Sequence, residues 1–517
     1  MPQTPSRLPK QPNILFIMAD DHASKAISCY GHGINHTPHI DRIAQGGMRL
    51  DHCYVSNSIC TPSRASILTG TYNHVNAVHT LASNFDNRLP HVAKHLRTGG
   101  YQTALIGKWH LGEGAAHQPS GFDHWAVLPG QGEYFDPQFI GPDGPYRESG
   151  YATDLITAKS LDWLAARDPA RPFFLMCHHK APHRPWEPHP RHRRLYNDPI
   201  QVPETFTDDY RHRARAAGAA KMRIADDLTY WDVGVVQPEG GAEVGAMEYP
   251  GSTVRKLPPL SAARDLRLID KNTGEVFTFT DEEHYRVWKY QRYMQRYLRT
   301  LAAIDEGVGE LLDYLDREGL AEDTLVIYTS DQGFFLGEHG WFDKRFMYEE
   351  SFQMPFVARY PRLIPAGTVS ADIASNVDFA PTFLDLAGLR VPSYMQGRSL
   401  RPLLADATPA DWPQVAYHRY WMHRDAIHDA YAHYGIRNQR YKLIYWYNQG
   451  LGMPGAHPGG EAPEWEFFDC EKDPLELLNC HADPRYQDEV AHMTRLLEEK
   501  MAEIGDDPVH LGQPGAR

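Results

Sequence analysis

Four short apolar stretches of the chain each end in polar residues that are capable of chemistry. They span residues 14–18, 103–106, 173–176 and 325–328, and each has the length of a buried strand. The residues that follow them are, in order, Asp20-Asp21; Lys108 and His110; His178, His179, Lys180 and His183; and Asp331-Gln332. Near-continuous apolar stretches of this length are typical of the strands of a parallel sheet.

Helical patterns occupy the stretches between these strands. One helix is predicted to begin at Thr37-Pro38 and to end near Gly46-Gly47, and another carries Leu89, Val92 and Leu96 on one face and stops at Gly99-Gly100. Strands that alternate with helices predict an α/β fold with a mostly parallel sheet and helices on both faces. Ligands of such sheets bind beyond the carboxyl ends of the strands, which is where the four polar clusters fall.

The clearest helical pattern begins at Thr280. Glu283 follows three residues later, so the two residues are predicted to form a capping box. Apolar residues then recur every three to five positions until Gly319, which predicts a long amphipathic helix packed on the sheet.

Two regions depart from the alternating pattern. Residues 197–280 have weak periodicity and are predicted to be an insertion of loops and short strands over the ligand-binding face. After residue 401 come aromatic, strand-like runs at 417–420, 434–437, 441–447 and 465–469, and then a helix from about Gln487 to Ile504. We therefore expect a catalytic domain over residues 1–401 and a small antiparallel α+β domain over residues 402–517.

The composition of the 517-residue chain is that of an ordinary globular protein. It is 42% hydrophobic and 23% charged, and its mean hydropathy is -0.53. The longest apolar runs are far shorter than the roughly 20 residues that a membrane-spanning helix needs. The net charge of -14 argues against nucleic-acid binding through a general basic field, so an anionic substrate must be held by locally placed cations.

The N-terminus and the cysteines bear on the compartment. Residues 1–10 are polar, and the apolar run that follows is too short for a signal peptide, so we expect a cytoplasmic protein. The six cysteines show neither disulfide-framework density nor zinc-type spacing. Cys470 and Cys480 could pair, but free thiols are the expected state. The sequence leaves the oligomeric state open.

The residues Asp20, Asp21, Asp331 and Gln332 offer three carboxylates and one amide oxygen. Oxygen ligands of this kind suit Ca²⁺ or Mg²⁺ rather than zinc or copper. Taken alone, an Asp-Asp pair is usually a turn or a helix cap, and Asp-Gln-Gly is usually a turn. Their shared placement at strand ends is what favours a metal site.

The segment from Ser58 to Gly70 carries the most specific pattern. It reads Ser-Ile-Cys-Thr-Pro-Ser-Arg-Ala-Ser-Ile-Leu-Thr-Gly, with Cys60 ahead of a helix expected to begin near Ser63. For an arbitrary cysteine, burial as a small apolar side chain would be the ordinary interpretation. The whole segment, however, closely resembles the sulfatase signature, Cys-x-Pro-Ser-Arg followed by a short helix that ends in Thr-Gly.

The resemblance continues along the chain in the order of the type I sulfatases, including bacterial glycan sulfatases. The further landmarks are Asp20-Asp21, residues 37–44 with Gly47, Gly107-Lys108-Trp109-His110-Leu111-Gly112, Lys180-Ala181-Pro182-His183, and Thr329-Ser330-Asp331-Gln332-Gly333 with Lys344. They cover roughly residues 12 to 480. The resemblance implies an alkaline-phosphatase-like α/β/α sandwich with a smaller C-terminal antiparallel-sheet domain, in agreement with the periodicity.

The resemblance also implies the cofactors. Cys60 would be oxidised by a formylglycine-generating maturation enzyme to formylglycine (3-oxoalanine). A metal, Ca²⁺ or else Mg²⁺, would be bound by Asp20, Asp21, the residue at Cys60, Asp331 and Gln332. One hydroxyl of the hydrated aldehyde attacks sulfur and the other expels sulfate, whereas a thiol adduct would have no easy exit.

The same resemblance assigns roles to five further residues. Arg64 would steady the nucleophile, and Lys108 and Lys344 would neutralise sulfuryl oxygens. His110 is the expected base, and His183 is the expected acid toward the leaving oxygen, because an imidazole titrates near working pH.

Two positions depart from the family pattern. Gln332 stands where the family often has Asn, which keeps an amide oxygen but lengthens its reach by one methylene. His39 replaces the Asn of the usual Thr-Pro-Asn, a change that concerns only the start of a helix.

Two loops are candidates for sugar binding. The runs Arg184-Pro185-Trp186-Glu187 and Gly337-Glu338-His339-Gly340-Trp341 contain side chains that stack on and hydrogen-bond sugars. Arg184, Trp186, Glu338 and His339 are the expected substrate-binding residues, although a packed tryptophan and surface charges explain the pattern equally well.

The leading hypothesis is therefore a sulfuric ester hydrolase that acts on a small sulfated carbohydrate, with 6-O-sulfated N-acetylglucosamine as first choice. A phosphate or phosphonate monoester hydrolase of the same superfamily is the enzymatic alternative. A two-zinc alkaline phosphatase fits less well, because the nucleophile position is a cysteine and the ligand positions lack histidine. An inactive relative that only binds sulfated sugars is a further alternative, which the complete set of catalytic residues disfavours.

Overall fold

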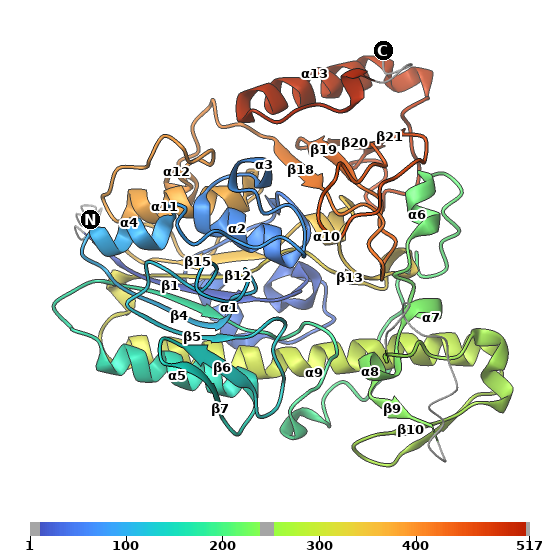
Figure 1. Ribbon diagram of the computed structural model, residues 1–517, viewed down its shortest axis with the longest axis horizontal. Coiled ribbons are helices and arrows are strands. Elements are labelled where there is room, and N and C mark those ends of the chain that lie inside the picture. The colour runs from blue at the N-terminus through green and yellow to red at the C-terminus, as the bar shows by residue number, and fades with distance from the viewer. Residues whose placement is uncertain (1–10, 238–252, 513–517) are drawn as a thin grey trace.

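A ten-stranded sheet forms the centre of the molecule in the computed structural model, which describes residues 11–237 and 253–512 (Figure 1). Its order is β16-β2-β15-β12-β1-β8-β4-β5-β6-β7. The strands are β1 (Asn13–Ala19), β2 (Met48–Leu50), β4 (Gln102–Lys108), β5 (His124–Leu128), β6 (Gln138–Gly141), β7 (Gly144–Arg147), β8 (Phe173–His178), β12 (Thr324–Ser330), β15 (Phe356–Arg359) and β16 (Thr368–Ser370). All four strands predicted from apolar runs are confirmed.

The five central strands, β12-β1-β8-β4-β5, are parallel, and antiparallel pairs flank them. Successive residues of β1 supply two different cores. Leu15 and Ile17 pack into one of them, whereas Phe16 and Met18 pack into the other. A strand buried on both faces cannot alternate apolar and polar residues, which explains its continuous apolar sequence.

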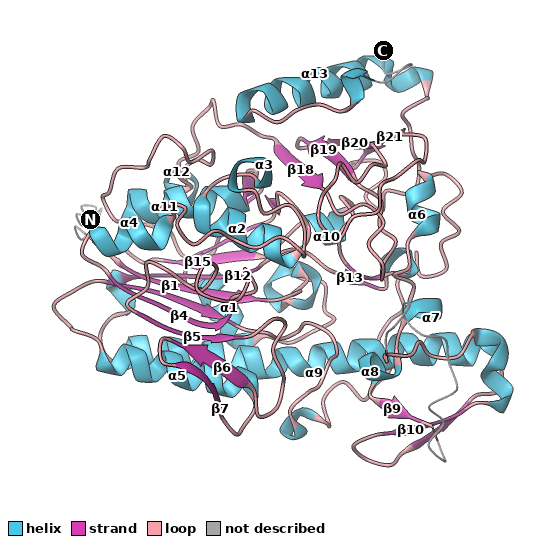
Figure 2. Ribbon diagram, in the orientation of Figure 1, coloured by secondary structure: helices cyan, strands magenta, loops and turns pink. Residues whose placement is uncertain are grey.

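Helices cover both faces of the sheet, so the predicted α/β/α sandwich is confirmed (Figure 2). One face carries α1 (Pro38–Gln45), α5 (Ala152–Ala166) and α9 (Glu282–Arg317). The other carries α2 (Cys60–Thr69), α4 (Val92–Thr98) and α11 (Phe379–Leu386). Among the described residues, no helix is both long enough and apolar enough to span a bilayer.

The start of α9 corrects the predicted capping box. The N-cap is Asp281, whose side chain accepts a hydrogen bond of 2.8 Å from the backbone N–H of His284. Thr280 lies one residue outside and does not cap the helix. A carboxylate at the N-cap both satisfies a free N–H and complements the helix dipole, which explains why Asp281 takes this position.

The insertion packs along the N-terminal half of α9, beyond the strand ends (Figure 1). It contains a small sheet of β9 (Val235–Val236), β10 (Arg267–Asp270) and β11 (Val276–Thr278), as predicted. It also contains α6 (Arg215–Ala219), α7 (Ile224–Asp227) and α8 (Tyr230–Val233), which the sequence did not predict. Helices this short depend on tertiary packing and leave little periodic signal. Residues 238–252 of the insertion lie outside the described residues.

The C-terminal region is a four-stranded antiparallel sheet covered by one helix. Its strands are β18 (Ala416–Tyr420), β19 (His433–Arg437), β20 (Tyr441–Trp446) and β21 (Glu464–Asp469), and α13 (Gln487–Ile504) lies against β19 and β20. Met493, Leu497 and Met501 of α13 pack on the sheet. These elements match the predicted ones. The domain boundary after residue 401 stays a prediction.

Short elements connect these regions. They are β3 (Cys53–Tyr54), α3 (Asn73–Asn76), β13 (Phe335–Leu336), β14 (Phe342–Asp343), α10 (Glu349–Phe352), β17 (Ala374–Ser375) and α12 (Arg401–Leu404). All six cysteines are free, including Cys470 and Cys480.

Candidate active site

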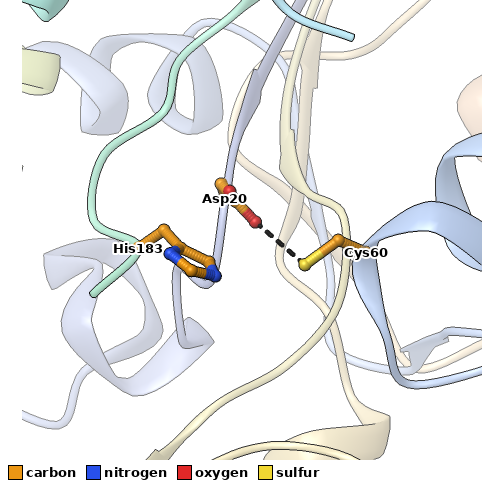
Figure 3. A group of neighbouring side chains, drawn as sticks. All are labelled: Asp20, Cys60 and His183. Atoms are coloured by element: carbon orange, nitrogen blue, oxygen red, sulfur yellow. Dashed lines mark hydrogen bonds between the residues drawn. The ribbon is translucent and has the colours of Figure 1, made fainter. Parts of the chain in front are cut away.

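The predicted polar clusters meet at the carboxyl edge of the central sheet. Ala19 of β1 is the register partner of Ser330 of β12, so Asp20-Asp21 and Asp331-Gln332 emerge side by side. Lys108 ends β4, and His183 follows β8, two strands that pair with each other. Figure 3 shows the side chains of Asp20, Cys60 and His183 pointing toward one another.

Three carboxylates form the floor of this site. Asp20, Asp21 and Asp331 are fully buried, and one oxygen of each lies within 4.8 Å of the others. The Sγ atom of Cys60 donates a hydrogen bond of 3.3 Å to Asp20 Oδ1 (Figure 3). Asp21 has a φ of 73°, a left-handed conformation that costs energy in a residue other than glycine and is common at functional sites.

Three buried cations match the three carboxylates. Lys108 Nζ contacts Asp20, Arg64 Nε lies 3.0 Å from Asp331 Oδ2, and Lys344 Nζ lies 2.6 and 2.7 Å from the two oxygens of Asp21. All six side chains are almost inaccessible to solvent. The pairs offset part of the cost of burying charge, and they leave the group close to neutral.

The three carboxylates differ in their affinity for protons. Burial raises the pKa of Asp21 to about 7, because Lys344 offsets only part of the burial cost. Burial and the neighbouring charge of Asp20 raise the pKa of Asp331 to about 6. Burial acts in the same direction on Asp20, but Lys108, His183 and Arg64 outweigh it and hold the pKa of Asp20 well below its usual value. Two of the three carboxylates would therefore gain from additional positive charge.

The donor set fits a hard divalent cation. Gln332 Nε2 donates to Asp21 Oδ1, whereas Gln332 Oε1 is buried and has no hydrogen-bond partner among the described residues. A buried amide oxygen without a partner is costly, and a cation beside the three carboxylates would satisfy it. The longer side chain of Gln332 therefore reaches the carboxylate group.

Cys60 is the first residue of α2, three residues earlier than the helix start expected from sequence. Its side chain is 1% exposed. Burial, reinforced by the charge of Asp20, raises the pKa of the thiol well above its usual value. The unmodified side chain is thus a protonated thiol and a poor nucleophile.

The two candidate acid–base histidines flank this centre. His183 Nε2 lies 3.9 Å from Asp21 Oδ2, and its Nδ1 bonds the carbonyl oxygen of Arg184 at 2.6 Å, which fixes the orientation of the ring. His110 Nδ1 lies 3.4 Å from the hydroxyl of Thr61, the neighbour of Cys60. Burial and Lys108 lower the pKa of both imidazoles well below the usual value.

Comparisons with known proteins agree with this geometry. Residues 12–389 match the sulfatase family, and residues 337–503 match the family described as N-sulphoglucosamine sulphohydrolase, C-terminal. The chain belongs to the sulfatase family. The protein is thus a sulfuric ester hydrolase, as predicted.

One relative of this sulfatase is similar over nearly its whole length. It is an N-acetylglucosamine-6-O-sulfatase of Bacteroides thetaiotaomicron, 43% identical over 510 residues, which cover 96% of this chain and 88% of the relative. A solved structure of a protein in complex with its substrate D-glucosamine-2-N,6-O-disulfate superposes with a TM-score of 0.85 at 42% identity, covering 96% of this chain and 99% of that one. The phosphonate monoester hydrolase of Agrobacterium radiobacter shares the fold, with a TM-score of 0.64 at 20% identity over 96% of each chain.

The four expected substrate-binding residues of the sulfatase make contacts within the protein. Trp186 is fully buried and packs edge-on against Tyr293, so it cannot stack on a sugar, and this expectation is wrong. Its apolar and aromatic neighbours explain the tryptophan as a core residue, the alternative that the sequence left open.

The other three residues are engaged by protein side chains. Arg184 bonds both carboxylate oxygens of Asp232, at 2.8 and 2.5 Å. Glu338 accepts a hydrogen bond of 2.9 Å from Lys25, and His339 Nδ1 lies 3.0 Å from Asp208 Oδ2. Through these pairs the three side chains stabilise the neighbouring loops. Direct contact with substrate stays a prediction for them.

Two residues of the site were not assigned from sequence. Lys180 is buried, its Nζ lies 4.5 Å from the centre of the Tyr134 ring, and burial together with Lys108 lowers its pKa to about 7. It belongs to the Lys180–His183 landmark, which was the available signal. Gln131, which accepts a hydrogen bond from Lys108, lies in a loop without any motif.

A cavity of about 400 Å³ opens beside the catalytic group. Its walls include Thr61 and His110, the indole rings of Trp109 and Trp125, and the carboxylate of Glu113. This combination of apolar surface with a few polar groups is typical of pockets for small ligands.

Proposed function

We propose that this sulfatase removes the 6-O-sulfate group from N-acetylglucosamine or a closely related sulfated glucosamine. The observation that carries the proposal is the 43% identity with the N-acetylglucosamine-6-O-sulfatase across 96% of this chain. The cavity beside His110 supports a small substrate, because its volume of about 400 Å³ is typical of sites that bind small ligands.

We further propose that the cofactor is Ca²⁺, with Mg²⁺ as the alternative. Asp20, Asp21, Asp331 and Gln332 would hold the ion, together with the modified residue 60. When bound, the cation would polarise a sulfuryl oxygen and favour deprotonation of a neighbouring hydroxyl. The all-oxygen donor set and the unpartnered Gln332 Oε1 support this assignment.

The proposed nucleophile is formylglycine, made from Cys60 by a maturation enzyme. When present, this group supplies a hydrated aldehyde whose hydroxyl can attack sulfur. The thiol of Cys60 supports the proposal through its position, since Sγ lies at the N-terminus of α2 and 3.3 Å from Asp20 Oδ1.

The buried cations would bind the sulfate group. Arg64, Lys108 and Lys344 each contact one carboxylate of the floor. A divalent cation would compensate those carboxylates, and the three side chains would then attract the negatively charged sulfuryl oxygens. The site would thus be locally positive within a chain of net charge -14.

The two histidines divide the proton transfers. His183 would donate a proton from Nε2 to the departing sugar oxygen when its ring is protonated, a form that the negative charge of a bound sulfate would favour. The bond from its Nδ1 to the Arg184 carbonyl leaves Nε2 as the atom near the carboxylates. His110 would accept a proton on the side of α2, where it lies next to Thr61 and lines the sugar cavity.

Steady-state kinetics on a substrate panel tests the proposed function. We expect kcat/KM for 6-O-sulfated N-acetylglucosamine to exceed that for an activated aryl sulfate by about tenfold or more, because sugar contacts add stabilisation only for the sugar. The 6-phosphate of the same sugar is the matched control, and it should react far more slowly. Efficient hydrolysis of aryl or choline sulfate with no turnover of sulfated sugars would overturn the carbohydrate assignment.

Peptide mass spectrometry tests the nucleophile separately. A peptide that spans residues 56–64 should carry the mass of an aldehyde at position 60 after coexpression with a formylglycine-generating enzyme. An unmodified thiol in an active preparation would contradict the proposed nucleophile.

A further inference from the structure

A second cavity, of about 330 Å³, lies between α9 and the insertion, outside the catalytic group. Its walls include four arginines, Arg193, Arg292, Arg296 and Arg299, and two aromatic side chains, Phe277 and Trp288. Pro188 also lines it, so the cavity adjoins the segment that follows His183.

The cavity has an excess of positive charge. Of its acidic wall residues, Asp270 pairs with Arg292, which leaves Glu275 as the other carboxylate. Arg193, Arg296 and Arg299 form no ion pair with any residue in 11–237 or 253–512. Three guanidinium groups without an ion-pair partner give the cavity a locally positive surface in a chain of net charge -14.

The guanidinium group of Arg296 is buried and is not fully hydrogen-bonded. Its Nε donates to the backbone oxygen of Asp232 at 3.1 Å. Its Nη2 has no hydrogen-bond partner within the described part of the chain. Burial and the nearby charge of Arg292 lower the pKa of Arg296 to about 9. A buried guanidinium N–H without an acceptor costs free energy, which an oxyanion would recover.

A glycine in the neighbouring backbone leaves room for the guanidinium group of Arg296. Gly234 has a φ of 61°, and a Cβ atom at this position would lie 2.4 Å from Cζ of Arg296. Arg299 is held in turn by the carbonyl oxygen of Leu195 at 2.8 Å and by Asn197 Oδ1 at 2.9 Å. The arginines are therefore positioned before any ligand arrives, which lowers the entropic cost of binding.

The aromatic residues indicate what carries the anion. Phe277 and Trp288 are half-buried, and their ring centres are 5.1 Å apart. A charged sugar has both an apolar ring face and an anionic group. The half-buried aromatic rings can pack against the ring face, and the guanidinium groups beside them can bind the anion.

We propose that this cavity is a second, noncatalytic site that binds the sulfate or carboxylate group of an acidic sugar, with Arg296 and Arg299 as the anion-binding residues. The site is separate from the substrate cavity beside His110, and the proposal does not depend on which sulfated sugar the enzyme hydrolyses.

Anomalous diffraction locates the oxyanion directly. Crystals of the full-length enzyme soaked in sodium selenate, a sulfate analogue, should show a selenium peak within hydrogen-bond distance of Arg296 or Arg299. A selenium peak confined to the catalytic site would overturn the proposal.

Calorimetric titration with glucuronic acid then tests the sugar. This probe carries a carboxylate but no sulfate ester, so it is not hydrolysed, and neutral N-acetylglucosamine is the matched ligand control. We expect Arg299→Gln, which removes one charged contact, and Arg193→Glu, which reverses the charge of an exposed wall residue, each to weaken glucuronic acid binding by about tenfold or more. Arg317→Gln, at the other end of α9, should bind as the wild type does, and aryl sulfate turnover should be unchanged in all three.

Two results of this titration would contradict the proposal. One is a glucuronic acid affinity that is the same in Arg299→Gln and Arg193→Glu as in Arg317→Gln and the wild type. The other is selenate in the cavity without glucuronic acid binding, which would show that the site takes free oxyanions and not an acidic sugar.

Discussion

Buried charges at the carboxyl edge of the central sheet and in the C-terminal sheet are organised in different ways. In the C-terminal sheet, Arg419 of β18 lies 2.5 Å from Asp506 Oδ1, and the hydroxyl of Tyr417 bonds the other oxygen at 2.6 Å. The guanidinium also lies 3.6 Å from the centre of the Trp421 ring. Arg419 sits in a regular strand and forms its ion pair with Asp506 within the protein, while its Nε has no hydrogen-bond partner among the described residues.

The catalytic edge differs in bringing three buried carboxylates, those of Asp20, Asp21 and Asp331, within 4.8 Å of one another. Asp21 has a left-handed backbone, Gln332 Oε1 has no partner among the described residues, and the pKa of Asp21 is raised to about 7. The ion pair of Arg419 with Asp506 forms without any ligand, whereas we propose that the polar groups of the catalytic edge bind a cation and an anionic substrate. The comparison predicts that substitutions separate cleanly into losses of activity and losses of stability.

The largest effect on activity should come from Cys60→Ala. The small side chain still fits the buried position, but the nucleophile is lost, so kcat should fall by about 10⁴-fold or more. Kinetics with 6-O-sulfated N-acetylglucosamine and a thermal melt measure the two consequences separately. Cys29→Ala, at a half-buried cysteine outside the site, is the control. Substantial activity in Cys60→Ala would sink the proposed nucleophile.

Removal of the cation should have the second-largest effect on activity. Chelation, or Asp331→Asn, should lower kcat by about a thousandfold, equivalent to several kcal/mol of transition-state stabilisation. Ca²⁺ or Mg²⁺ should restore the chelated enzyme better than Zn²⁺. Metal analysis and activity after readdition check this, and revival by zinc alone would show that the all-oxygen assignment is wrong.

His183→Ala should have the third-largest effect on activity. Its kcat should fall by about 10²- to 10⁴-fold, the usual contribution of a general acid. The loss should be much smaller on an activated aryl sulfate, because that leaving group needs no proton. An equal loss on both substrates would contradict the role of His183 as the acid.

Gln332→Asn should have a smaller effect, a decrease of about tenfold in kcat/KM that added Ca²⁺ partly rescues. The shorter amide keeps the oxygen but retracts it by one methylene. A metal titration that shows unchanged affinity would exclude Gln332 as a ligand.

Arg419→Met should change turnover least. It leaves Asp506 buried without its ion-pair partner, so the free energy of unfolding should fall by about 3–5 kcal/mol while kcat stays near the wild-type value. Urea denaturation and kinetics measure the two quantities. A loss of kcat comparable to that of His183→Ala would contradict the prediction that Arg419 contributes to stability and not to activity.

The features that sequence predicted best are those that depend on local periodicity. The four strand ends, and the helix Gln487–Ile504, follow from runs of apolar residues whose spacing is a property of the backbone. The meeting of Asp20 with Asp331 could also be predicted, because parallel strands present their carboxyl ends at one edge. Periodicity could not assign a role to Cys60, and the role proposed for it comes from the resemblance to the sulfatase signature.

Other features depend on tertiary contacts that a linear pattern does not contain. Thr280 and Asp281 are both good N-caps, and the choice between them rests on which side chain reaches the N–H of His284. Trp186 has the composition of a sugar-binding residue but packs against Tyr293. The unpaired guanidinium of Arg296 becomes visible only once the insertion lies against α9.

The pairing of β1 with β12 has a consequence for the order of events during synthesis. Arg64 and Asp331 are in contact, yet 267 residues separate them along the chain. A ribosome adding about 5–20 residues per second needs some tens of seconds to cover that distance. During this interval the Cys60 segment cannot be enclosed by β12, whereas in the finished fold its side chain is 1% exposed. The maturation enzyme proposed above therefore has access to Cys60 for a time that depends on the rate of translation. Slower synthesis of residues 64–331 should raise the fraction of chains that carry the aldehyde.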